Sequence, residues 1–488
     1  MKIKCALLAL LMLVSVFAAA CSDGGTDTPD TGVVSDTAVT ETTAAPEPEY
    51  VWAELDFKDG NLNILNTNTT WGFYTTIYFE EQTGSMIDDA IYDANRKIEE
   101  KFNVILKVTE SDINKSVGEY TTAILAGDGA YDTALTAANR TAPLLLQKYV
   151  ADLSQIKEFQ LDEPWWNQNI MKFSSFGEGG HVFFGVSDIN MMSFEVLMGI
   201  YVNDDMLADL NIPKLYDTVR DGKWTVDKMH ECMKAAVNLN GDASFTYDPK
   251  GSARYGLTYW DSGLQAIMYG AGLSYVVLDE KNNPSLNVEN DTFYSTMENI
   301  GSMFVVDGEA VYLNSSKDRM HYEDSFADGR ALFTVAQLKG STKFREMDDE
   351  FGILPLPKAN EAQKDYIGFC SGNVVASTIP KSNTKPGEAA GVIDAMAYLA
   401  YSELRPVYEG IVVEQKQMRN ADSIEMLQIM GANRVLDVGA IYSWTSNLHK
   451  AIFNKIKAGD SAVASDVAAQ KPAIEALFKD TIAAFAGE

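Results

Sequence analysis

The chain has 488 residues, and 46% of them are apolar, so it is long enough to bury more than one hydrophobic core. Its formal net charge is -30 at pH 7, with 69 acidic side chains against 39 basic ones. Because Lys and Arg supply the affinity for nucleic acids and for anionic lipid headgroups, this charge opposes both kinds of partner.

The first residues have the pattern of a targeting signal. Two lysines precede an apolar run at residues 5–20, and Cys21 follows small residues that suit a cleavage site. The run is shorter than the ~20 residues that a membrane-spanning helix needs. Residues 18–21, AAAC, resemble a bacterial lipobox. We therefore expect residues 1–20 to be a lipoprotein signal peptide and Cys21 to be lipidated, with a plain secretory signal as the alternative.

Residues 21–50 are rich in Ser, Thr, Asp, Ala, Gly and Pro and contain no Lys or Arg. Such a composition is typical of a disordered tether. No later apolar stretch has membrane length, so we expect a folded body held to the membrane by lipid alone. Cys232 and Cys370 remain for that body. We expect two buried free thiols, with a disulfide as the alternative.

The folded part begins with alternating strand and helix patterns. Strands are predicted at residues 61–66, 104–108 and 132–137, and helices at residues 85–102, 117–126 and 143–149. Ser85 and Asp88 are expected to form a capping box, and Gly127 to end the second helix. This order predicts parallel strands covered by helices.

Ligands of parallel sheets bind at the carboxyl ends of the strands. That rule nominates the loop after the first strand, residues 66–74, and the pair that follows the third strand. The candidate residues there are Asn68, Trp71, Tyr74, Asn139 and Arg140.

Two apolar, β-prone runs at residues 182–186 and 196–202 flank a polar segment, residues 187–195. We interpret this segment as a crossover between two sheets, with a strand-loop-strand inside one domain as the alternative. Because ligand pockets favour domain interfaces, its polar residues become site candidates: Ser187, Asp188, Asn190 and Glu195. A helix is expected to begin near Asp204.

The remaining chain continues the mixture of strands and helices. Thr225 is expected to cap a helix at residues 226–237, and Trp260 and Asp261 join a predicted strand to a predicted helix. Further strands are predicted at residues 255–259, 331–335, 352–356 and 370–379, and further helices at residues 261–269, 293–306, 389–401, 435–455 and 461–486.

Five short motifs stand in a recognisable order: ILAGD at residues 124–128 with Asp132, IYVNDDML at 200–207, GKWTV at 222–226, FADGRALF at 326–333 and GILPLP at 352–357. This series resembles the extracellular solute-binding proteins of bacterial ABC importers, the large family that includes maltodextrin-binding proteins. The resemblance covers residues 61–488. The chain departs from the family pattern at residues 129–131, where Gly-Ala-Tyr replaces the usual Pro-Pro, and at Asp205, where Lys is usual.

The resemblance implies an α/β, two-lobe periplasmic-binding-protein fold of type II, each lobe a mostly parallel sheet covered by helices. It implies a first lobe at residues 51–188 with a return segment at 340–378, and a second lobe at residues 189–339 with C-terminal helices at 379–488. Hinge crossings are expected at residues 187–195 and 372–379.

The implied function is capture of a carbohydrate, above all an oligosaccharide, in the cleft between the lobes and its delivery to an ABC permease. The protein would act as a monomer without cofactor, metal or catalysis, lipid-anchored on the outer face of the cell membrane or in the periplasm. Sugar rings stack on aromatic side chains, and Asp, Asn and Arg bond sugar hydroxyl groups. Trp71, Tyr74, Trp260 and Trp444 are therefore candidates beside Asn139 and Arg140, and core packing is the alternative for each tryptophan.

Two other classes stay open: a surface glycan-degrading lipoprotein, and a glycan-adhesion module without a transporter. Residues 368–372, GFCSG, have the spacing of a nucleophile elbow with Asp437 and His449 in order, but strand-like residues follow where an elbow needs a helix. Residues 238–249 imitate a calcium loop, yet Ala243 stands where Gly is required and Pro249 where a bidentate Glu belongs.

Overall fold

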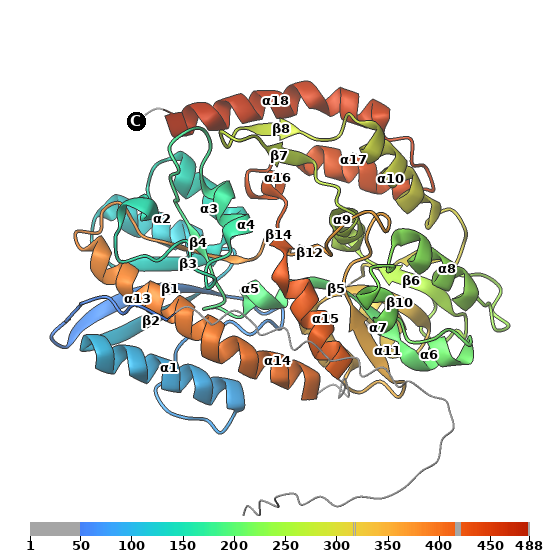
Figure 1. The fold of residues 1–488 in the computed structure, drawn as a ribbon, viewed down its shortest axis with the longest axis horizontal. Helices are drawn as coiled ribbons and strands as arrows, with labels where there is room; N and C mark the ends of the chain where they lie inside the picture. Colours follow the sequence, from blue (N-terminus) through green and yellow to red (C-terminus); the bar gives the residue numbers. More distant parts are fainter. Residues whose placement is uncertain (1–48, 316, 318, 415–420, 487–488) are drawn as a thin grey trace, which may run out of the picture. The chain divides into compact units, whose positions relative to one another are not determined.

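Two five-stranded sheets with helices around them organise the protein (Figure 1). The structure is a computed structural model, and it describes residues 49–486 except residues 316, 318 and 415–420. The expected signal peptide, Cys21 and nearly all of the expected tether lie outside the described residues. Within the described ranges, no helix has the length and apolarity needed to cross a membrane.

The first sheet has the strand order β2-β1-β3-β13-β4. β1 (Gly60–Asn68) pairs in parallel with β2 (Val104–Asp112) and β3 (Thr133–Ala137), as the alternating pattern predicts. β13 (Val375–Thr378) runs antiparallel to both β3 and β4 (Gly185–Val186). The connecting helices are α1 (Met86–Phe102), α2 (Ser116–Ala126) and α3 (Ala138–Leu146).

Local signals explain most boundaries of these helices. α1 buries Ile87, Ile91 and Ile98, which recur at helical spacing. Gly127 ends α2 with φ 63°, the left-handed conformation that glycine adopts at low cost. The capping box expected at Ser85 is not formed, because the Asp88 carboxylate accepts hydrogen bonds from the hydroxyl groups of Tyr74 and Thr83 instead.

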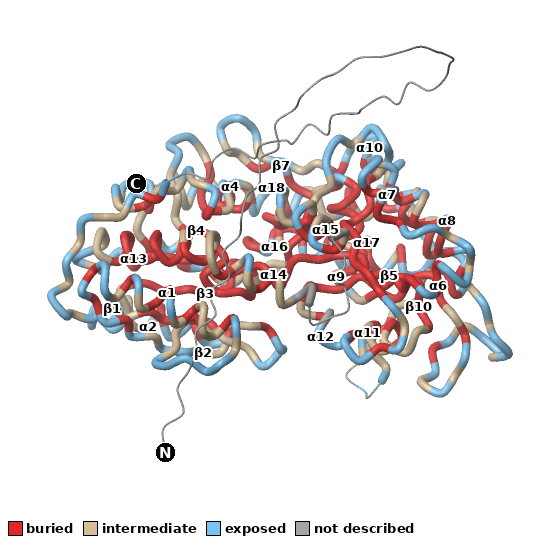
Figure 2. Tube along the Cα trace, turned by 60° about the horizontal axis from the view of Figure 1, so that its bottom comes forward, coloured by how far each residue is buried: buried red, intermediate tan, exposed pale blue. Residues whose placement is uncertain are grey.

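The second sheet has the order β11-β5-β10-β6-β9. β6 (Tyr255–Tyr259) is parallel to β9 (Ala310–Tyr312) and β10 (Ala331–Gln337), whereas β5 (Met198–Asn203) is antiparallel to β10 and β11 (Phe351–Leu354). Each sheet therefore mixes parallel and antiparallel pairs more evenly than expected. Buried segments, red in Figure 2, include β5, β10 and the later helix α13 (Pro386–Leu399).

Helices around the second sheet begin where the sequence predicts. Asn203 accepts a hydrogen bond from Met206 N at the start of α6, and Thr225 accepts one from Lys228 N at the start of α8. These caps confirm the two predicted helix starts. The remaining elements of this region are α6 (Asp204–Asp209), α7 (Tyr216–Arg220), α8 (Val226–Ala236), α9 (Asp261–Gly270), β7 (Val276–Leu278), β8 (Pro284–Leu286), α10 (Asp291–Ser302), α11 (Tyr322–Ala327) and α12 (Ser341–Phe344).

Three segments run side by side between the sheets. The first crossing, residues 187–197, connects β4 to β5 and contains α5 (Met192–Glu195), so the predicted crossover is confirmed. The second crossing, residues 355–374, connects β11 to β13 and contains β12 (Gly368–Phe369). The C-terminal link, residues 433–437, contains β14 (Arg434–Val435), which pairs in parallel with β12. A bridge between Leu197 and Cys370 joins the first two.

The chain divides between the sheets differently from the expected lobe boundaries. In the return segment 340–378, β11 extends the second sheet and only β13 joins the first, because the apolar residues of β11 pair with the edge of β5. α13, the π-helical segment η4 (Ala400–Leu404) and α14 (Arg405–Glu414) pack against α1 of the first sheet, although they were expected in the second lobe (Figure 1).

The C-terminal helices complete the fold. α15 (Ala421–Ala432) packs on β11, and α18 (Ala464–Ala486) packs on α17 (Ser446–Lys457), β8 and α3. The helix predicted at residues 435–455 is instead divided into β14, the short α16 (Val438–Ile441) and α17. Ser443 lies between the last two with φ 57°, a conformation that interrupts a right-handed helix.

Candidate functional site

Four polar side chains meet at the carboxyl edge of the first sheet; we call them the amide–arginine cluster: Asn114, Asn139, Arg140 and Asn373. Arg140 Nη1 donates hydrogen bonds to Oδ1 of Asn139 (2.9 Å) and Oδ1 of Asn373 (3.1 Å), and its Nη2 donates to Oδ1 of Asn114 (3.1 Å). Asn139 Nδ2 donates to Asn373 Oδ1 at 3.2 Å. The predicted pair Asn139 and Arg140 is therefore part of a larger polar group.

The second crossing positions this cluster. Backbone N–H groups at the start of α3 donate to the crossing, from Ala138 to Val374 O and from Asn139 to Gly372 O. A Cβ on Gly372 would lie 3.0 Å from the Asn139 Cβ, so glycine permits this close approach. Burial lowers the pKa of the half-buried Arg140, and the charge of nearby Asp112 offsets part of that effect.

A second cluster lies where β6 and β9 end; we call it the second-sheet cluster: Trp260, Asp261, Tyr312 and Asn314. Tyr312 Oη donates to Asp261 Oδ1 at 2.7 Å, and Asn314 Nδ2 donates to Asp261 Oδ2 at 2.8 Å. The half-buried ring of Trp260 stacks on Tyr322 at 5.7 Å and 8°. Trp260 Nε1 is buried and has no hydrogen-bond partner among the described residues. An indole N–H in this state is ready for an acceptor on a ligand or a water molecule.

The loop after β1 contacts both the first crossing and the second sheet. Trp71 is 43% exposed, and its carbonyl oxygen accepts a hydrogen bond from Lys339 Nζ at 2.6 Å. Lys339 lies within the short 3-10 helix η3 (Leu338–Gly340), which directly follows β10, so this bond joins the edges of the two sheets. Asn68 is the last residue of β1. Burial raises the pKa of Glu110, and a hydrogen bond between the Asn68 side chain and the Glu110 carboxylate partly offsets this rise. Tyr74 N donates to Glu195 Oε2 at 2.5 Å.

The polar residues predicted in the first crossing hold the protein together and present little surface to a solute. Asp188, Asn190 and Glu195 are 3%, 0% and 5% exposed, and Ser187 is also buried. Asn190 Nδ2 donates to Asn66 Oδ1 at 2.9 Å, and Glu195 accepts hydrogen bonds from Tyr74 N and from the Tyr408 hydroxyl. Their expected role in ligand binding is not supported.

Asp188 forms a buried ion pair that links the first crossing to the C-terminal link. Its carboxylate accepts hydrogen bonds from Arg434 Nη1 at 2.7 Å and from Arg434 Nη2 at 3.1 Å, and Arg405 Nη1 lies 3.7 Å away. Burial alone would raise the pKa of Asp188, but the charges of Arg434 and Arg405 outweigh burial and lower it.

Trp444 belongs to the core, contrary to its expected place in the ligand site. The residue is 3% exposed, and its Nε1 donates to Thr481 Oγ1 of α18 at 3.1 Å. Its ring stacks on Tyr442 at 4.8 Å and meets Phe478 edge-on at 4.8 Å. α18 covers this ring, and nothing in the local sequence around Trp444 indicates that cover.

The elbow-like residues 368–372 are not arranged as a nucleophilic site. Cys370 is fully buried, and burial raises the pKa of its thiol to about 12. β13 follows this segment where an elbow requires a helix. Asp437 accepts from Gln265 Nε2 at 3.0 Å, and His449 Nδ1 bonds the Tyr275 hydroxyl at 2.9 Å. Cys370 and Cys232 are both free and buried, as expected.

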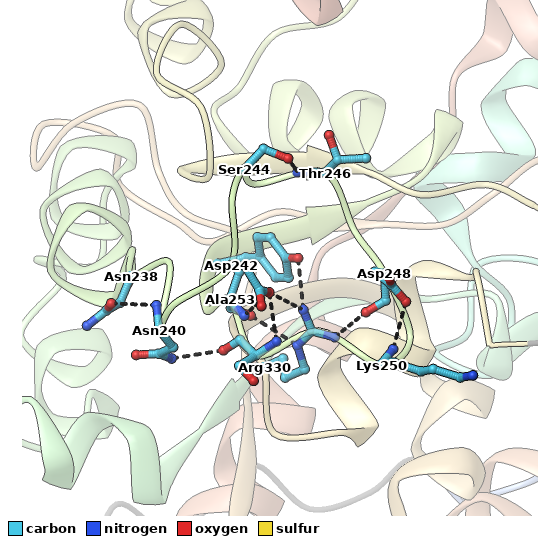
Figure 3. A network of polar contacts seen from close by, with 11 residues as sticks. Asn238, Asn240, Asp242, Ser244, Thr246, Asp248, Lys250, Ala253 and Arg330 are labelled. Atoms are coloured by element: carbon cyan, nitrogen blue, oxygen red, sulfur yellow. Dashed lines mark hydrogen bonds and ion pairs between the residues drawn. The ribbon is translucent and has the colours of Figure 1, made fainter.

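The calcium-like loop at residues 238–249 is organised by an arginine of the protein (Figure 3). Arg330 donates to the carbonyl oxygens of Asp248 and Ala253 at 2.6 and 3.0 Å, and its Nη2 lies 3.9 Å from the Asp242 carboxylate. The guanidinium thus serves as the cation of this loop. Within the described residues, no group of three or more His, Cys, Asp or Glu is placed to hold a metal ion.

Sequence reasoning missed several residues of the two clusters. Asn114 follows the carboxyl end of β2, and Tyr312 and Asn314 lie at the carboxyl end of β9, so the rule that nominated Arg140 also applies to them. Asn373 and Lys339 carry no comparable signal, because distant parts of the chain bring Asn373 to the amide–arginine cluster and Lys339 to the Trp71 carbonyl oxygen.

Comparisons with known proteins support the fold. No model of a known protein family matches the sequence, and no curated protein matches it either. Among solved structures, the GacH receptor of Streptomyces glaucescens has a TM-score of 0.54 and 13% identity, covering 88% of this chain and 100% of that one. UspC of M. tuberculosis has a TM-score of 0.55 and 12% identity, covering 86% and 100%.

An ABC substrate-binding protein from Listeria monocytogenes in complex with cycloalternan is also similar, with a TM-score of 0.54 and 12% identity over 86% of this chain and 99% of that one. At these identities the likeness establishes the fold. The predicted two-lobe α/β fold is therefore confirmed.

Proposed function

We propose that this protein captures a carbohydrate between its lobes and delivers it to an ABC permease. The supporting observation is the extent of the fold. The aligned structures are covered almost completely, at 99 to 100% of their length, so this chain has counterparts for both sheets and for the segments between them. Two of these neighbours were solved with the carbohydrates acarbose and cycloalternan bound.

The two clusters supply groups suited to a sugar. Trp260 offers an indole N–H that has no partner in the described part of the chain, and a ring that is partly accessible. The first-sheet edge offers an arginine and amide side chains, which bond hydroxyl oxygens. Sugar recognition needs both an aromatic surface and polar groups, and these are the residue types that the carboxyl edges of the two sheets provide.

A thermal-shift screen with a panel of soluble glycans tests this proposal. A ligand that binds only the folded protein stabilises it by RT ln(1+[L]/Kd), about 2.7 kcal/mol at a hundredfold excess over Kd. We expect a raised unfolding temperature with one class of oligosaccharide and no release of shorter products. Product release would favour a glycan-degrading lipoprotein, and binding only to insoluble glycan would favour an adhesion module.

The proposal includes a lipid anchor at Cys21. A Cys21→Ala protein should fold and bind ligand but leave the membrane fraction, because the tether has no basic residue to hold headgroups. Cys5→Ala is the matched control, since it leaves the lipobox-like residues intact and should stay with the membrane. Retention of the Cys21→Ala protein in washed membranes would contradict the anchor.

A further inference from the structure

Among the arginines that the structure describes, Arg140 differs from most in forming no ion pair with a described acidic side chain. The chain has 69 acidic residues, and most arginines that the structure describes form ion pairs with them. The paired ones are Arg96, Arg220, Arg254, Arg319, Arg330, Arg405 and Arg434. Arg345 also has no described ion pair, but it is exposed on the surface. Arg140 is the half-buried arginine whose described partners are all neutral amides.

The hydrogen bonds of the cluster leave donors without partners. A guanidinium has five N–H groups, and the described contacts of Arg140 engage three of them, each with an amide oxygen. The Oδ1 of Asn373 accepts hydrogen bonds from Arg140 and Asn139. The groups left to meet a ligand are therefore chiefly N–H donors, and the guanidinium among them is charged.

The acidic side chain that acts electrostatically on Arg140 is already engaged elsewhere. The Asp112 carboxylate affects the pKa of Arg140, yet its Oδ1 accepts hydrogen bonds from N and Nδ2 of Asn114 at 2.9 and 3.1 Å. A site for neutral sugar hydroxyls gains from carboxylates that accept hydroxyl protons, and this cluster contains none. A partly desolvated guanidinium that forms no ion pair can bind an oxyanion with two parallel, charge-assisted hydrogen bonds.

We propose that the solute is an acidic saccharide, whose carboxylate or sulfate ester binds Arg140 with the Asn373 amide as a second donor. This inference rests on the proposed function and specifies its substrate class. The strongly negative chain repels a polyanion at long range, so a short oligosaccharide with one or a few acidic groups fits best. The three amide oxygens hold the guanidinium in place before the ligand arrives, which lowers the entropic cost of binding.

The test uses pairs of oligosaccharides that differ only in charge: oligo-uronates with their methyl esters, and sulfated oligosaccharides with their desulfated forms. Affinities are measured by titration calorimetry for the wild type, Arg140→Gln, Arg140→Lys and the exposed control Arg345→Gln. We expect an acidic member to bind about 10 to 100 times more tightly than its neutral counterpart. Arg140→Gln should remove this preference, Arg140→Lys should keep part of it, and Arg345→Gln should keep all of it.

Each outcome decides the question. Preference for the uronate or for the sulfate identifies the acidic group and supports the proposal. A neutral member that binds as tightly as its acidic counterpart overturns the proposal and leaves carbohydrate capture intact. Binding of no saccharide in any pair overturns both. If Arg140→Gln does not fold, as judged by its thermal transition, the preference of the wild type and of Arg140→Lys decides alone.

Discussion

At the residue scale, Trp444 and Trp260 differ in how much of each ring the protein covers. Trp444 is 3% exposed and packs against Tyr442 and Phe478. Trp444→Ala should therefore lower the free energy of unfolding by about 3 to 5 kcal/mol, the usual cost of a large core truncation. Urea denaturation followed by circular dichroism measures this change. A loss below 1 kcal/mol would contradict the core role.

Trp260→Ala should have the opposite pattern. Its ring is half-buried and its Nε1 has no partner within the described residues, so removing it costs less packing than in the core. We expect glycan affinity to fall about tenfold or more, with a smaller loss of stability than for Trp444→Ala. Parallel calorimetry and urea denaturation separate the two effects. Unchanged affinity would remove Trp260 from the site.

Asp437 provides a pH-dependent prediction. Burial raises the pKa of this carboxyl from 3.8 to about 6, although hydrogen bonds from Tyr269 and Gly439 oppose the rise. The folded protein therefore holds a proton that the unfolded chain releases, and stability falls as pH increases from about 4 to 6. A difference of this size corresponds to ~3 kcal/mol.

Asp437→Asn replaces the carboxyl by a neutral group of the same shape. The stability of this variant relative to wild type should increase between pH 4 and pH 7 by up to ~3 kcal/mol. Asp162→Asn, at an exposed position, is the control for the chemical change itself and is measured over the same pH range. A constant difference for Asp437→Asn would show that its carboxyl is not perturbed by folding.

Residues with local causes were predictable, and residues with distant partners were not. The caps at Asn203 and Thr225 depend on backbone groups three residues away, which the sequence places directly. Asp188 was correctly located in a crossing, but its partner Arg434 lies 246 positions further along the chain. Once that partner neutralises Asp188 inside the protein, its carboxylate is no longer available to a solute.

At the scale of elements, the Asp188–Arg434 pair fastens the first crossing to the C-terminal link. Both side chains are almost fully buried, at 3% and 10% exposure. Arg434→Met would leave the Asp188 carboxylate buried with only the more distant Arg405, so we expect a loss of about 3 to 5 kcal/mol in the free energy of unfolding. The double variant Asp188→Asn, Arg434→Met should recover part of this loss, because no buried charge remains unpaired.

An exposed ion pair serves as the control for this prediction. Arg254 and Asp209 lie 3.3 Å apart with 39% and 62% exposure. Arg254→Met should change stability by no more than about 1 kcal/mol. Equal effects of Arg254→Met and Arg434→Met in urea denaturation would contradict a special role of the buried pair.

Sequence patterns predicted helices and strands whose apolar residues recur at a regular spacing. They failed where contacts with distant parts of the chain break one regular segment into several elements. The alternation around β1 to β3 was sufficient for the first sheet. In residues 435–455 the apolar spacing suggested one helix. In the structure, Arg434 and Val435 pair with β12 as a strand, and the positive φ of Ser443 interrupts the helix further along. Whether α13 and α14 belong to the first or the second lobe depends on which lobe provides an apolar surface for them to pack against. An amphipathic pattern shows that a helix has an apolar side but does not specify its packing partner.

At the scale of the whole molecule, the order in which the chain passes between the two sheets determines how movement of the lobes can be tested. β13 of the first sheet follows all five strands of the second sheet in the sequence, and α13 and α14, which come still later, also pack on the first lobe. Neither lobe is therefore a single continuous piece of sequence, and cutting the chain at one point does not release a complete lobe. A test of lobe movement must use the whole folded body.

We expect ligand binding to bring the lobes together. Few segments connect the two sheets, and short connections allow rotation of the bodies that they join. A ligand shifts such an equilibrium only if it binds the closed arrangement better, which requires contacts with both lobes. Small-angle scattering should then give a smaller radius of gyration with a bound glycan than without it. Arg140→Gln at the same glycan concentration should keep the unliganded radius, because it weakens glycan binding. An unchanged radius for the wild type at saturating glycan would show that capture occurs without closure.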